Sequence, residues 1–371
     1  MEQLIIMWIL TNTPSLENPG GIATYYAVLK PHWTSDITYL TSCARVGRER
    51  KWATPVRLIR DYFGFFRTLR RDPYDVVLIN TSLFPKAVIR DAIFFLLAKA
   101  FHKRTVLFIR GWHPDFEQSV RRYFLRVFRS VYSGADVVIV LASEFKDKLI
   151  EMGFHGKIIT ETTAVDDEIF SKRHGGDGNR KAQEEPSSFN ILFLSRIEES
   201  KGIYIVLDTY RILKQRHPEV SLTVAGDGPE LAKARQYAID RGIKGVEFSG
   251  YVRGRAKDLA LARADVYFFP SYHEGMPGSV LEAMAYGLPI VTRPVGGVAD
   301  FFADGRMGFA SESRDPQVFA EFLERLVCDR DMCSMMGAFN RDYAKERFAA
   351  SSVAKRLEEV FQSVLSADTN G

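Results

Sequence analysis

The sequence has 371 residues, of which 46% are hydrophobic, so it is long enough for two domains of ordinary size and too apolar for a disordered chain. Its three cysteines form neither a CxxC pair nor an even-numbered framework, which argues against a disulfide scaffold or a zinc site and favours a reducing compartment. The formal net charge is +4, but residues 41–130 hold 19 Lys or Arg against 7 Asp or Glu. Such a basic block can meet phosphates, anionic lipid headgroups or simply water.

In the first half of the chain, short apolar runs alternate with stretches of helical spacing. The run LIIMWIL near the N-terminus lacks the basic residues of a signal peptide and is too short to span a bilayer, so we expect a buried strand there and no transmembrane helix in the chain. Alternating strands and helices are typical of a parallel α/β sheet. The strands predicted for this half cover residues 4–10, 76–80, 105–110 and 137–141.

A polar stretch at 171–188, SKRHGGDGNRKAQEEPSS, has no apolar periodicity, and we interpret it as an interdomain linker. It separates an N-terminal domain over 1–170 from a C-terminal domain over 189–345. The alternation of strands and helices resumes after the linker, which predicts a second doubly wound domain. Its strands are predicted at 190–195, 220–226, 246–250, 265–270 and 289–292.

The last segment, 346–371, contains an amphipathic pattern. Within SVAKRLEEVFQSVLSA at 352–367, apolar residues recur at helical spacing and predict a closing helix. The residues of this apolar face are Val353, Leu357, Val360 and Val364.

Ligands of an open α/β sheet bind beyond the carboxyl ends of its strands, so the residues that follow each strand are the first candidates for a site. Arg196 follows the strand at 190–195, and Lys201 precedes Gly202 at the start of a helix. Two cations beside helix N-terminal amides suit a diphosphate, although an Arg and a Lys on an exposed loop are the plainer alternative. The glycines of GDGPE at 226–230 permit a close backbone approach, but a lone glycine turn is a weak motif.

Two glutamates flank the loop of the segment DVYFFPSYHEGMPGSVLEAMAYG. Glu274 lies just beyond the carboxyl end of a strand. Glu282 lies in the first turns of the next helix, which we expect to be capped near Ser279 and to end at Gly287. One carboxylate can accept hydrogen bonds from sugar hydroxyls and the other from a second polyol such as ribose, while free amides at 278–280 face an anion. Alternatively, Glu282 only complements the helix dipole and Glu274 is a solvated loop acid.

The N-terminal half has two matching features. Gly20 and Gly21 end the loop after the first strand and lead into a helix, another place where backbone can approach phosphate. His113 lies just beyond the carboxyl end of the strand at 105–110. A histidine in such a place is more often structural than catalytic, so His113 is a candidate and no more.

Together these residues resemble the retaining nucleotide-sugar glycosyltransferases of the GT-B fold, specifically the large glycosyltransferase family 4 of bacterial polysaccharide or glycolipid assembly. The segments SRIEESKG, AGDGPE, FSGYV, HEGMPGSVLEAMAYGLPIV and VGGVADFF occur in the order typical of that family over 189–310. Before that, GGIATY, SGADVVIVLASEF and AVDDEIF fit a looser pattern. The resemblance implies two Rossmann-like doubly wound α/β domains that face each other across a cleft, with the C-terminal helix packing back on the N-terminal domain.

By this resemblance the chain is a retaining hexosyltransferase (EC 2.4 class) that uses a nucleotide-diphosphate sugar as co-substrate. The catalytic candidates are Arg196 and Lys201 on the donor diphosphate, Glu274 on the transferred sugar and His113 facing that sugar from the acceptor domain, while Glu282 would hold the ribose. The other donor contacts that the family implies are Val252 near the base and, around phosphate and sugar, Gly20, Gly21, Gly278, Ser279 and Val280.

The resemblance implies neither a cofactor nor a metal. Family members retain the anomeric configuration without a protein nucleophile, because the departing diphosphate helps to deprotonate the acceptor. Its developing negative charge is what two cations and helix dipoles can stabilise. We interpret the one DxD match, at 329–331, as surface, since it lies in a helical stretch beyond the last strand. The segment ETTAVDDEIF departs from the family, which usually has Asn and Gly ahead of Val-Asp.

Three other functions fit the same architecture. They are a sugar-nucleotide epimerase, a phosphorylase-like enzyme and a non-catalytic nucleotide-sugar binding module. The glutamate pair, together with the segment GMPGSVLEAMA, is more typical of the transferases than of the epimerases. An epimerase would convert the donor alone into a new sugar isomer, which separates the two activities.

The basic block favours a membrane partner. In RLIRDYFGFFRTLRR at 57–71, apolar residues share one helical face and arginines lie opposite; in SVRRYFLRVFRSVY at 119–132 we expect a second stripe. Core packing explains such stripes about as well as a bilayer does, but arginine with abundant phenylalanine is typical of interfacial helices. No nucleic-acid motif is present. We therefore expect a saccharide or lipid-linked saccharide acceptor and a cytoplasmic protein, peripheral on the inner face of the cell membrane. The second stripe consists of Val120, Phe124, Val127 and Val131.

Overall fold

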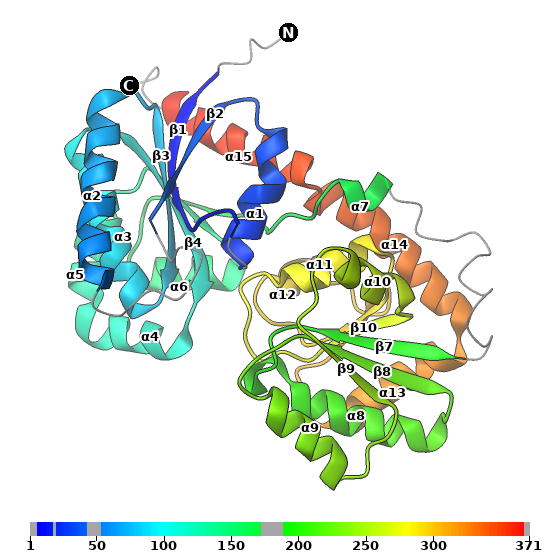
Figure 1. Cartoon of the computed structure of the whole chain (residues 1–371). Helices are drawn as coiled ribbons and strands as arrows, with labels where there is room; N and C mark the ends of the chain where they lie inside the picture. The colour runs from blue at the N-terminus through cyan, green and yellow to red at the C-terminus, as the bar shows by residue number, and fades with distance from the viewer. Residues whose placement is uncertain (1–5, 18–19, 43–52, 172–187, 367–371) are drawn as a thin grey trace. The chain divides into compact units, whose positions relative to one another are not determined.

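The computed structural model describes residues 6–17, 20–42, 53–171 and 188–366 of the chain. The chain divides into two compact units: unit 1 comprises Met1–Ala164 and Ala350–Gly371, and unit 2 comprises Val165–Ala349. Each unit has its own six-stranded sheet, and every neighbouring pair of strands is parallel (Figure 1). The prediction of two doubly wound α/β domains is confirmed.

The boundaries of the two units along the chain differ from those predicted for the domains. Residues 165–170 and 346–349 belong to unit 2, because Val165 donates a backbone hydrogen bond of 2.8 Å to the Phe348 carbonyl and pairs with Ala349 in a parallel bridge. The linker predicted at 171–188 lies outside the described residues except for its first and last positions.

Unit 1 has the strand order β2-β1-β3-β4-β5-β6. The interior strands are buried on both faces, as the continuous apolar runs predict. Its strands are β1 (Trp8–Thr13), β2 (Asp36–Thr41), β3 (Val76–Leu83), β4 (Arg104–Trp112), β5 (Val137–Val140) and β6 (Lys157–Thr160). Its helices are α1 (Gly21–Leu29), the 3₁₀ turn η1 (Lys30–His32), α2 (Ala53–Arg71), α3 (Pro85–Ala100), α4 (Pro114–Ser119), the π-helical turn η2 (Val120–Phe124), α5 (Leu125–Tyr132), α6 (Ser143–Glu151) and α15 (Ala350–Leu365).

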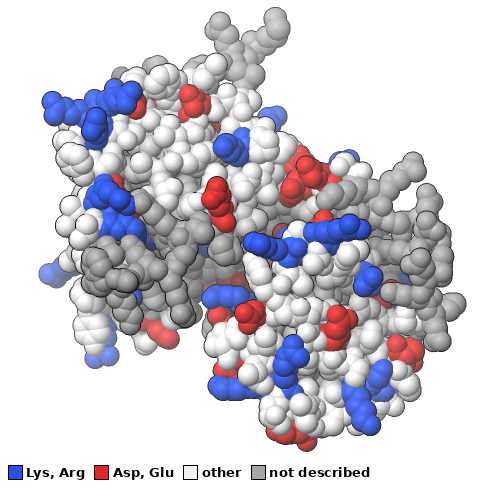
Figure 2. All heavy atoms as spheres, in the orientation of Figure 1, with Lys and Arg blue, Asp and Glu red and all other residues white. Residues whose placement is uncertain are grey.

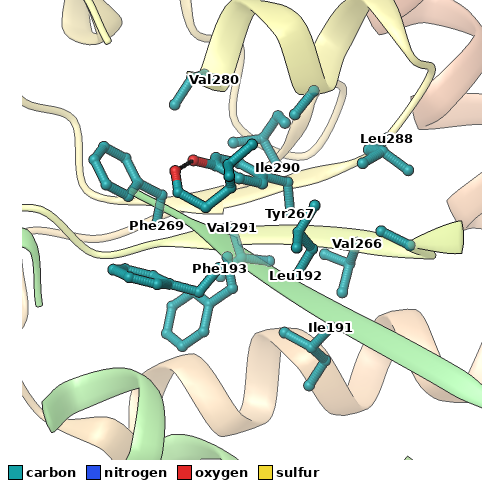
Figure 3. Close-up of a cluster of buried hydrophobic side chains, with 14 of the residues drawn as sticks. Ile191, Leu192, Phe193, Val266, Tyr267, Phe269, Val280, Leu288, Ile290 and Val291 are labelled. Atoms are coloured by element: carbon teal, nitrogen blue, oxygen red, sulfur yellow. Dashed lines mark hydrogen bonds between the residues drawn. The ribbon is translucent and has the colours of Figure 1, made fainter. Parts of the chain in front are cut away.

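Unit 2 has the strand order β12-β11-β10-β7-β8-β9. Figure 3 shows its core, in which side chains of three neighbouring strands pack together beneath Val280 of α11. Its strands are β7 (Phe189–Leu194), β8 (Val220–Ala225), β9 (Val246–Gly250), β10 (Val266–Phe269), β11 (Ile290–Thr292) and β12 (Gly308–Ala310). Its helices are α7 (Glu168–Ser171), η3 (Glu199–Lys201), α8 (Ile203–Arg216), α9 (Leu231–Asp240), α10 (Arg255–Arg263), α11 (Gly278–Ala285), α12 (Val298–Phe301), α13 (Pro316–Cys328) and α14 (Arg330–Phe348).

The closing helix α15 packs on unit 1, against α1 and β4, as the family resemblance implies. Val353, Leu357 and Val364 are buried, whereas Val360 is half-buried. The buried Glu358 adds a polar anchor, since its carboxylate accepts hydrogen bonds from the Thr34 and Ser35 backbone amides at 2.9 and 2.7 Å.

The four residues of the stripe predicted for 119–132 do not share one face. Val120 is buried and Val131 half-buried, whereas Phe124 and Val127 are 54% and 63% exposed, and Phe128 and Tyr132 are the residues that pack in the core. The cause is η2, because one π-helical turn changes the angular spacing of the residues that follow it. On α2 the apolar face predicted for 57–71 contributes Phe65 and Leu69 to the core, where both are buried.

In the described part of the chain, no helix is both long and apolar enough to cross a bilayer.

Candidate functional site

In the sheet of unit 2, the order of the strands reverses between β7 and β10. From β7 the strand order continues to β8 and β9, and from β10 it continues the other way to β11 and β12. Loops that leave the carboxyl ends of two such strands diverge and form the usual ligand site of an open α/β sheet. Arg196 and Lys201 lie on the loop after β7, and Glu274 lies on the loop after β10, so all three predicted residues follow the carboxyl ends of two neighbouring strands.

Gly202 fixes how these two loops meet. It has a left-handed backbone, with φ of +81°, and a Cβ at this position would overlap the Pro270 carbonyl. The Tyr272 amide completes the contact by donating a hydrogen bond of 2.8 Å to the Ser200 carbonyl. Both the backbone angle and the lack of space therefore require glycine, and the cation-bearing loop is held against the glutamate-bearing loop.

The glycine turn GDGPE supports the same loop from the other side. The Ile197 amide donates to the Asp227 carbonyl at 3.0 Å, and the Glu230 amide donates to the Ile197 carbonyl at 3.1 Å. A Cβ on Gly226 or Gly228 would overlap backbone atoms of Ser195 or Ile197. The close backbone approach predicted for these glycines is confirmed, and the backbone that approaches is that of the β7 loop.

Lys201 and Glu274 form an ion pair. Lys201 Nζ lies 2.6 Å from Glu274 Oε1, and the side chains are 17% and 13% exposed. The hydroxyl of buried Ser271 donates to the same Oε1 at 2.7 Å. Among the described residues both bonds reach Oε1, so Oε2 retains its capacity to accept hydrogen bonds from a ligand. Arg196 differs, because its side chain is 74% exposed and pairs with nearby Glu198 at 3.0 Å.

Glu282 lies in α11 and pairs with Lys257 of α10, whose Nζ is 2.7 Å from Oε1. Helix α11 begins at Gly278, one residue before the predicted cap, and no side chain of the described residues caps it. The Ser279 hydroxyl instead lies 2.7 Å from the hydroxyl of Tyr267. Tyr267 is fully buried, and this burial raises its pKa above the usual value for tyrosine.

The amides at 278–280 differ from the expectation in one respect. Val280 donates its N–H to the Pro277 carbonyl at 3.0 Å, so this amide is already satisfied, and its side chain is buried in the core (Figure 3). Gly278 and Ser279 are the first two residues of the helix, whose amides have no acceptor within it. The structure therefore leaves two amides, rather than three, for an anion.

Residues that the sequence reasoning missed hold Glu274 in place. Gly296 has φ of +55°, and a Cβ there would overlap the Glu274 and Gly275 carbonyls. Arg293 Nη1 donates to the Ser271 carbonyl at 3.3 Å, and burial lowers the pKa of this guanidinium. The glycine belongs to VGGVADFF, so the motif was visible in the sequence but its role as a support for the glutamate loop was not.

Val252 follows β9 and is half-buried against the core of unit 2. The DxD match at 329–331 begins α14, where the Asp329 carboxylate accepts a hydrogen bond of 2.8 Å from the Met332 amide. Asp329 is therefore a helix cap. Its placement agrees with the interpretation of this motif as surface.

The remaining predicted residues belong to unit 1. Gly20, with φ of +154°, precedes α1, and no atom of the described residues lies within 4 Å of a Cβ built on Gly20 or Gly21. His113 is exposed at the start of α4, and its ring centroid lies 5.9 Å from that of Phe84, which follows β3. These residues therefore lie at the carboxyl ends of β1 and β4 in the sheet of unit 1.

Two family models match the chain. The model of glycosyl transferases group 1 matches residues 178–343, and that of a glycosyl transferase 4-like domain matches residues 34–160. A similar curated relative is the D-inositol 3-phosphate glycosyltransferase of Corynebacterium urealyticum, 27% identical over 257 residues, which are 64% of this chain and 58% of the relative. The chain thus spans less than two thirds of that relative's length.

Solved structures of similar fold cover nearly the whole chain. The HepE protein of Anabaena, in complex with UDP and glucose, is 18% identical with a TM-score of 0.71 and covers 96% of this chain and 100% of its own. The sucrose-phosphate synthase of Thermosynechococcus elongatus is 15% identical with a TM-score of 0.75, over 97% and 100%. These likenesses show the fold. With both of its units matched by glycosyltransferase models, the chain belongs to the GT-B glycosyltransferases of the family 4 type.

Proposed function

We propose that the protein transfers a hexosyl-type sugar from a nucleotide-diphosphate donor to a saccharide or lipid-linked saccharide acceptor, with retention of the anomeric configuration. The observation that supports this most directly is the ion pair between Lys201 and Glu274, with Nζ 2.6 Å from Oε1. It lies where the strand order of unit 2 reverses. It joins a cation suited to phosphate with a carboxylate suited to sugar hydroxyls.

In this proposal the cations act on the leaving group. Cleavage of the bond between the anomeric carbon and the diphosphate leaves negative charge on the diphosphate oxygens. Arg196, Lys201 and the first two amides of α11 stabilise that charge, and such preorganised electrostatics is often the largest contribution to catalysis. No metal is required, because the cations and amides supply the positive charge.

The other residues position the donor. Glu274 accepts hydrogen bonds from the transferred sugar, and Glu282 accepts them from the ribose hydroxyls. Val252 lies near the base, Gly20 and Gly21 let backbone approach phosphate, and His113 contacts the sugar. HepE was solved with UDP and glucose, which makes UDP-glucose the first donor to test.

A panel of UDP- and GDP-sugars, each incubated with the protein and without acceptor, tests the donor class. Slow release of the nucleoside diphosphate from one donor supports the proposal, and NMR of the product formed with an acceptor then reports the anomeric configuration. A new sugar isomer without release of the nucleotide identifies an epimerase instead. Absence of both binding and turnover for the whole panel contradicts the proposal.

We also propose that the protein serves polysaccharide or glycolipid assembly at the cytoplasmic face of the cell membrane. The support is the excess of basic residues in unit 1 between positions 41 and 130. Residues 43–52 of this block lie outside the described residues.

A further inference from the structure

We infer that unit 1 docks on an anionic lipid bilayer through one face formed by α2, α3 and the η2–α5 segment. Nine large apolar side chains are exposed on these three elements, more than half of all such side chains in the described part of the chain. Their exposed fractions run from 40% for Ile93 to 70% for Ile89. We call this set the apolar face; it consists of Val56, Ile59, Phe63, Ile89, Ile93, Leu96, Tyr123, Phe124 and Val127.

The three elements lie side by side, with α3 in the middle. The rings of Tyr62 on α2 and Phe94 on α3 are 4.8 Å apart, and the Tyr62 hydroxyl donates to the Arg90 carbonyl at 3.3 Å. On the other flank, the Tyr132 hydroxyl of α5 donates to the Val88 carbonyl at 2.6 Å. Figure 1 shows α2, α3 and α5 on the same side of the sheet. The exposed side chains therefore belong to one continuous helical layer.

The side chains of the apolar face are not part of the hydrophobic core. Each of these elements already buries large side chains against the sheet, among them Phe65, Phe94 and Phe128. A water-facing helix surface is normally polar. On α3, however, the exposed positions between Lys86 and Ala100 are Ile89, Ile93 and Leu96. Contiguous apolar surface of this kind marks a protein or membrane contact.

The charges around the apolar face favour a membrane over a protein as its partner. Basic side chains are exposed on the same elements, and Figure 2 shows Lys and Arg in blue along the part of unit 1 where Figure 1 places α2. In the described residues of these elements the only acids are Asp61 and Asp91, and both are buried. The exposed basic residues are Arg60, Arg67, Arg70, Arg71, Lys86, Arg122, Arg126 and Arg129.

An anionic bilayer fits both features of this face. Its acyl region takes up the apolar side chains, and its headgroups attract the arginines. In a two-fold dimer built on the same face, the arginines of one copy would meet those of the other. A nucleic acid would leave the isoleucines and leucine of α3 without an apolar partner. Docking on a bilayer does not require the proposed function; only the idea that the acceptor is lipid-linked rests on it. If the acceptor is lipid-linked, this face is the surface that brings the protein to it.

The first experiment is flotation of the full chain with phosphatidylcholine vesicles and with vesicles that also contain phosphatidylglycerol, at low and high NaCl. We expect stronger binding to the anionic vesicles and weaker binding at high salt, because screening reduces the contribution of the arginines. UDP binding measured on the same preparations reports on the donor site. A chain that floats but binds no nucleotide contradicts the proposed function alone, and one that binds nucleotide but does not float contradicts the docking face alone.

Matched variants then locate the face. Phe63→Glu combined with Ile93→Glu is expected to lower the partition coefficient by at least about tenfold, because two side chains that enter the bilayer become charged. The control is Ile239→Glu, which changes a side chain that is 70% exposed on α9 of unit 2. Arg67→Glu combined with Arg70→Glu should weaken binding to anionic vesicles only, with exposed Lys244→Glu as the control. All changed residues are exposed, so circular dichroism and UDP affinity should remain those of the parent.

Several outcomes would overturn the inference. Binding that the two double variants leave unchanged would place the contact elsewhere on the chain. Equal binding to neutral and anionic vesicles at all salt concentrations would remove the role of the arginines. A dimer that Phe63→Glu with Ile93→Glu dissociates, together with no vesicle binding, would assign the apolar face to a second copy of the chain.

Discussion

Lys201 has its positive charge balanced by Glu274, and both side chains are largely shielded from solvent. Removal of either partner therefore leaves a partly desolvated charge without its counter-ion. An ammonium group has three hydrogen-bond donors, so the bond to Glu274 leaves two donors for phosphate oxygens. This geometry allows Lys201 to hold the leaving group and to position the sugar-binding carboxylate at the same time.

We expect Lys201→Ala and Arg196→Ala each to lower kcat/KM by about 100- to 1,000-fold, the usual effect of losing one donor to a developing negative charge. The measurement is steady-state release of nucleotide from the donor identified in the panel. Lys244→Ala, which removes an exposed lysine of unit 2, is the control and should keep its activity. Thermal unfolding of each variant separates loss of catalysis from loss of fold. Near-normal turnover in both site variants would contradict the assignment.

The two glutamates are expected to separate nucleotide binding from sugar binding. Glu282→Ala should weaken UDP affinity by about 10- to 100-fold, because it removes the charged carboxylate that accepts hydrogen bonds from the ribose hydroxyls. Glu274→Ala should leave UDP affinity close to that of the parent while turnover falls, because UDP has no transferred sugar. Calorimetric titration with UDP measures both. Equal losses of UDP affinity in the two variants would contradict the separate roles.

At the scale of residues, the sequence was most informative where the side chain itself can bind or stabilise the ligand. Arg196, Lys201 and Glu274 follow predicted strands that are neighbours in the sheet, and Lys201 and Glu274 are in contact. Ser271 and Gly296 act only through Glu274, by a hydrogen bond to its side chain and by backbone packing. Such supporting contacts join loops that are distant in the chain, and no local pattern identifies them.

At the scale of elements, Gly202 joins the β7 loop to the β10 loop. We expect Gly202→Ala to lower both the midpoint of thermal unfolding and the activity, because an alanine there has a strained left-handed backbone and also overlaps the Pro270 carbonyl. Gly242→Ala is the matched control: Gly242 has φ of +63°, but a Cβ there has no atom within 4 Å. The control should show only the strain, about 1–2 kcal/mol. Equal effects of the two substitutions would mean that the loop contact contributes nothing.

The polar anchor of α15 gives a second prediction at this scale. Glu358→Ala should destabilise the protein by about 1–3 kcal/mol, because it leaves the buried Ser35 amide without its acceptor. The neighbouring Glu359 is exposed, so Glu359→Ala is expected to have little effect. Urea unfolding followed by circular dichroism compares the two variants. A Glu358 variant as stable as the Glu359 variant would show that α15 is held by apolar packing alone.

The sequence predicts most interior strands well because burial on both faces makes them continuous apolar runs. The exception is β1, predicted at 4–10 and observed at Trp8–Thr13. The sequence does not predict β2, β6 or β12, which lie at the edges of the two sheets. Every residue of β2 and β6 is half-buried or exposed, and β12 has three residues, so none of them gives a strong apolar signal. The π-helical turn η2 likewise has no signature in the apolar pattern, so the residues of the stripe predicted across it do not share one face.

At the scale of the whole molecule, the chain passes between the units twice, at 164–165 and at 349–350. These places are adjacent, because Val165 pairs with Ala349 and its amide bonds to the Phe348 carbonyl. The sequence predicted the number and type of the domains. It did not predict that residues 346–349 belong with unit 2, since the helical pattern of the last segments gives no sign of which core each helix covers.

This topology predicts that truncation after Ala349 destabilises unit 1 rather than unit 2. Helix α15 contributes Leu357 and Phe361, both fully buried, and packs against α1 and β4 of unit 1. Loss of a fully buried side chain of this size costs about 2–5 kcal/mol. Hydrogen exchange should therefore become faster in peptides from β1 and β4 and stay slow in those from β7 and β10, and UDP should still bind. A chain truncated after Leu365 keeps the helix and is the control. Faster exchange in β7 and β10, with β1 and β4 unchanged, would contradict the assignment of α15 to unit 1.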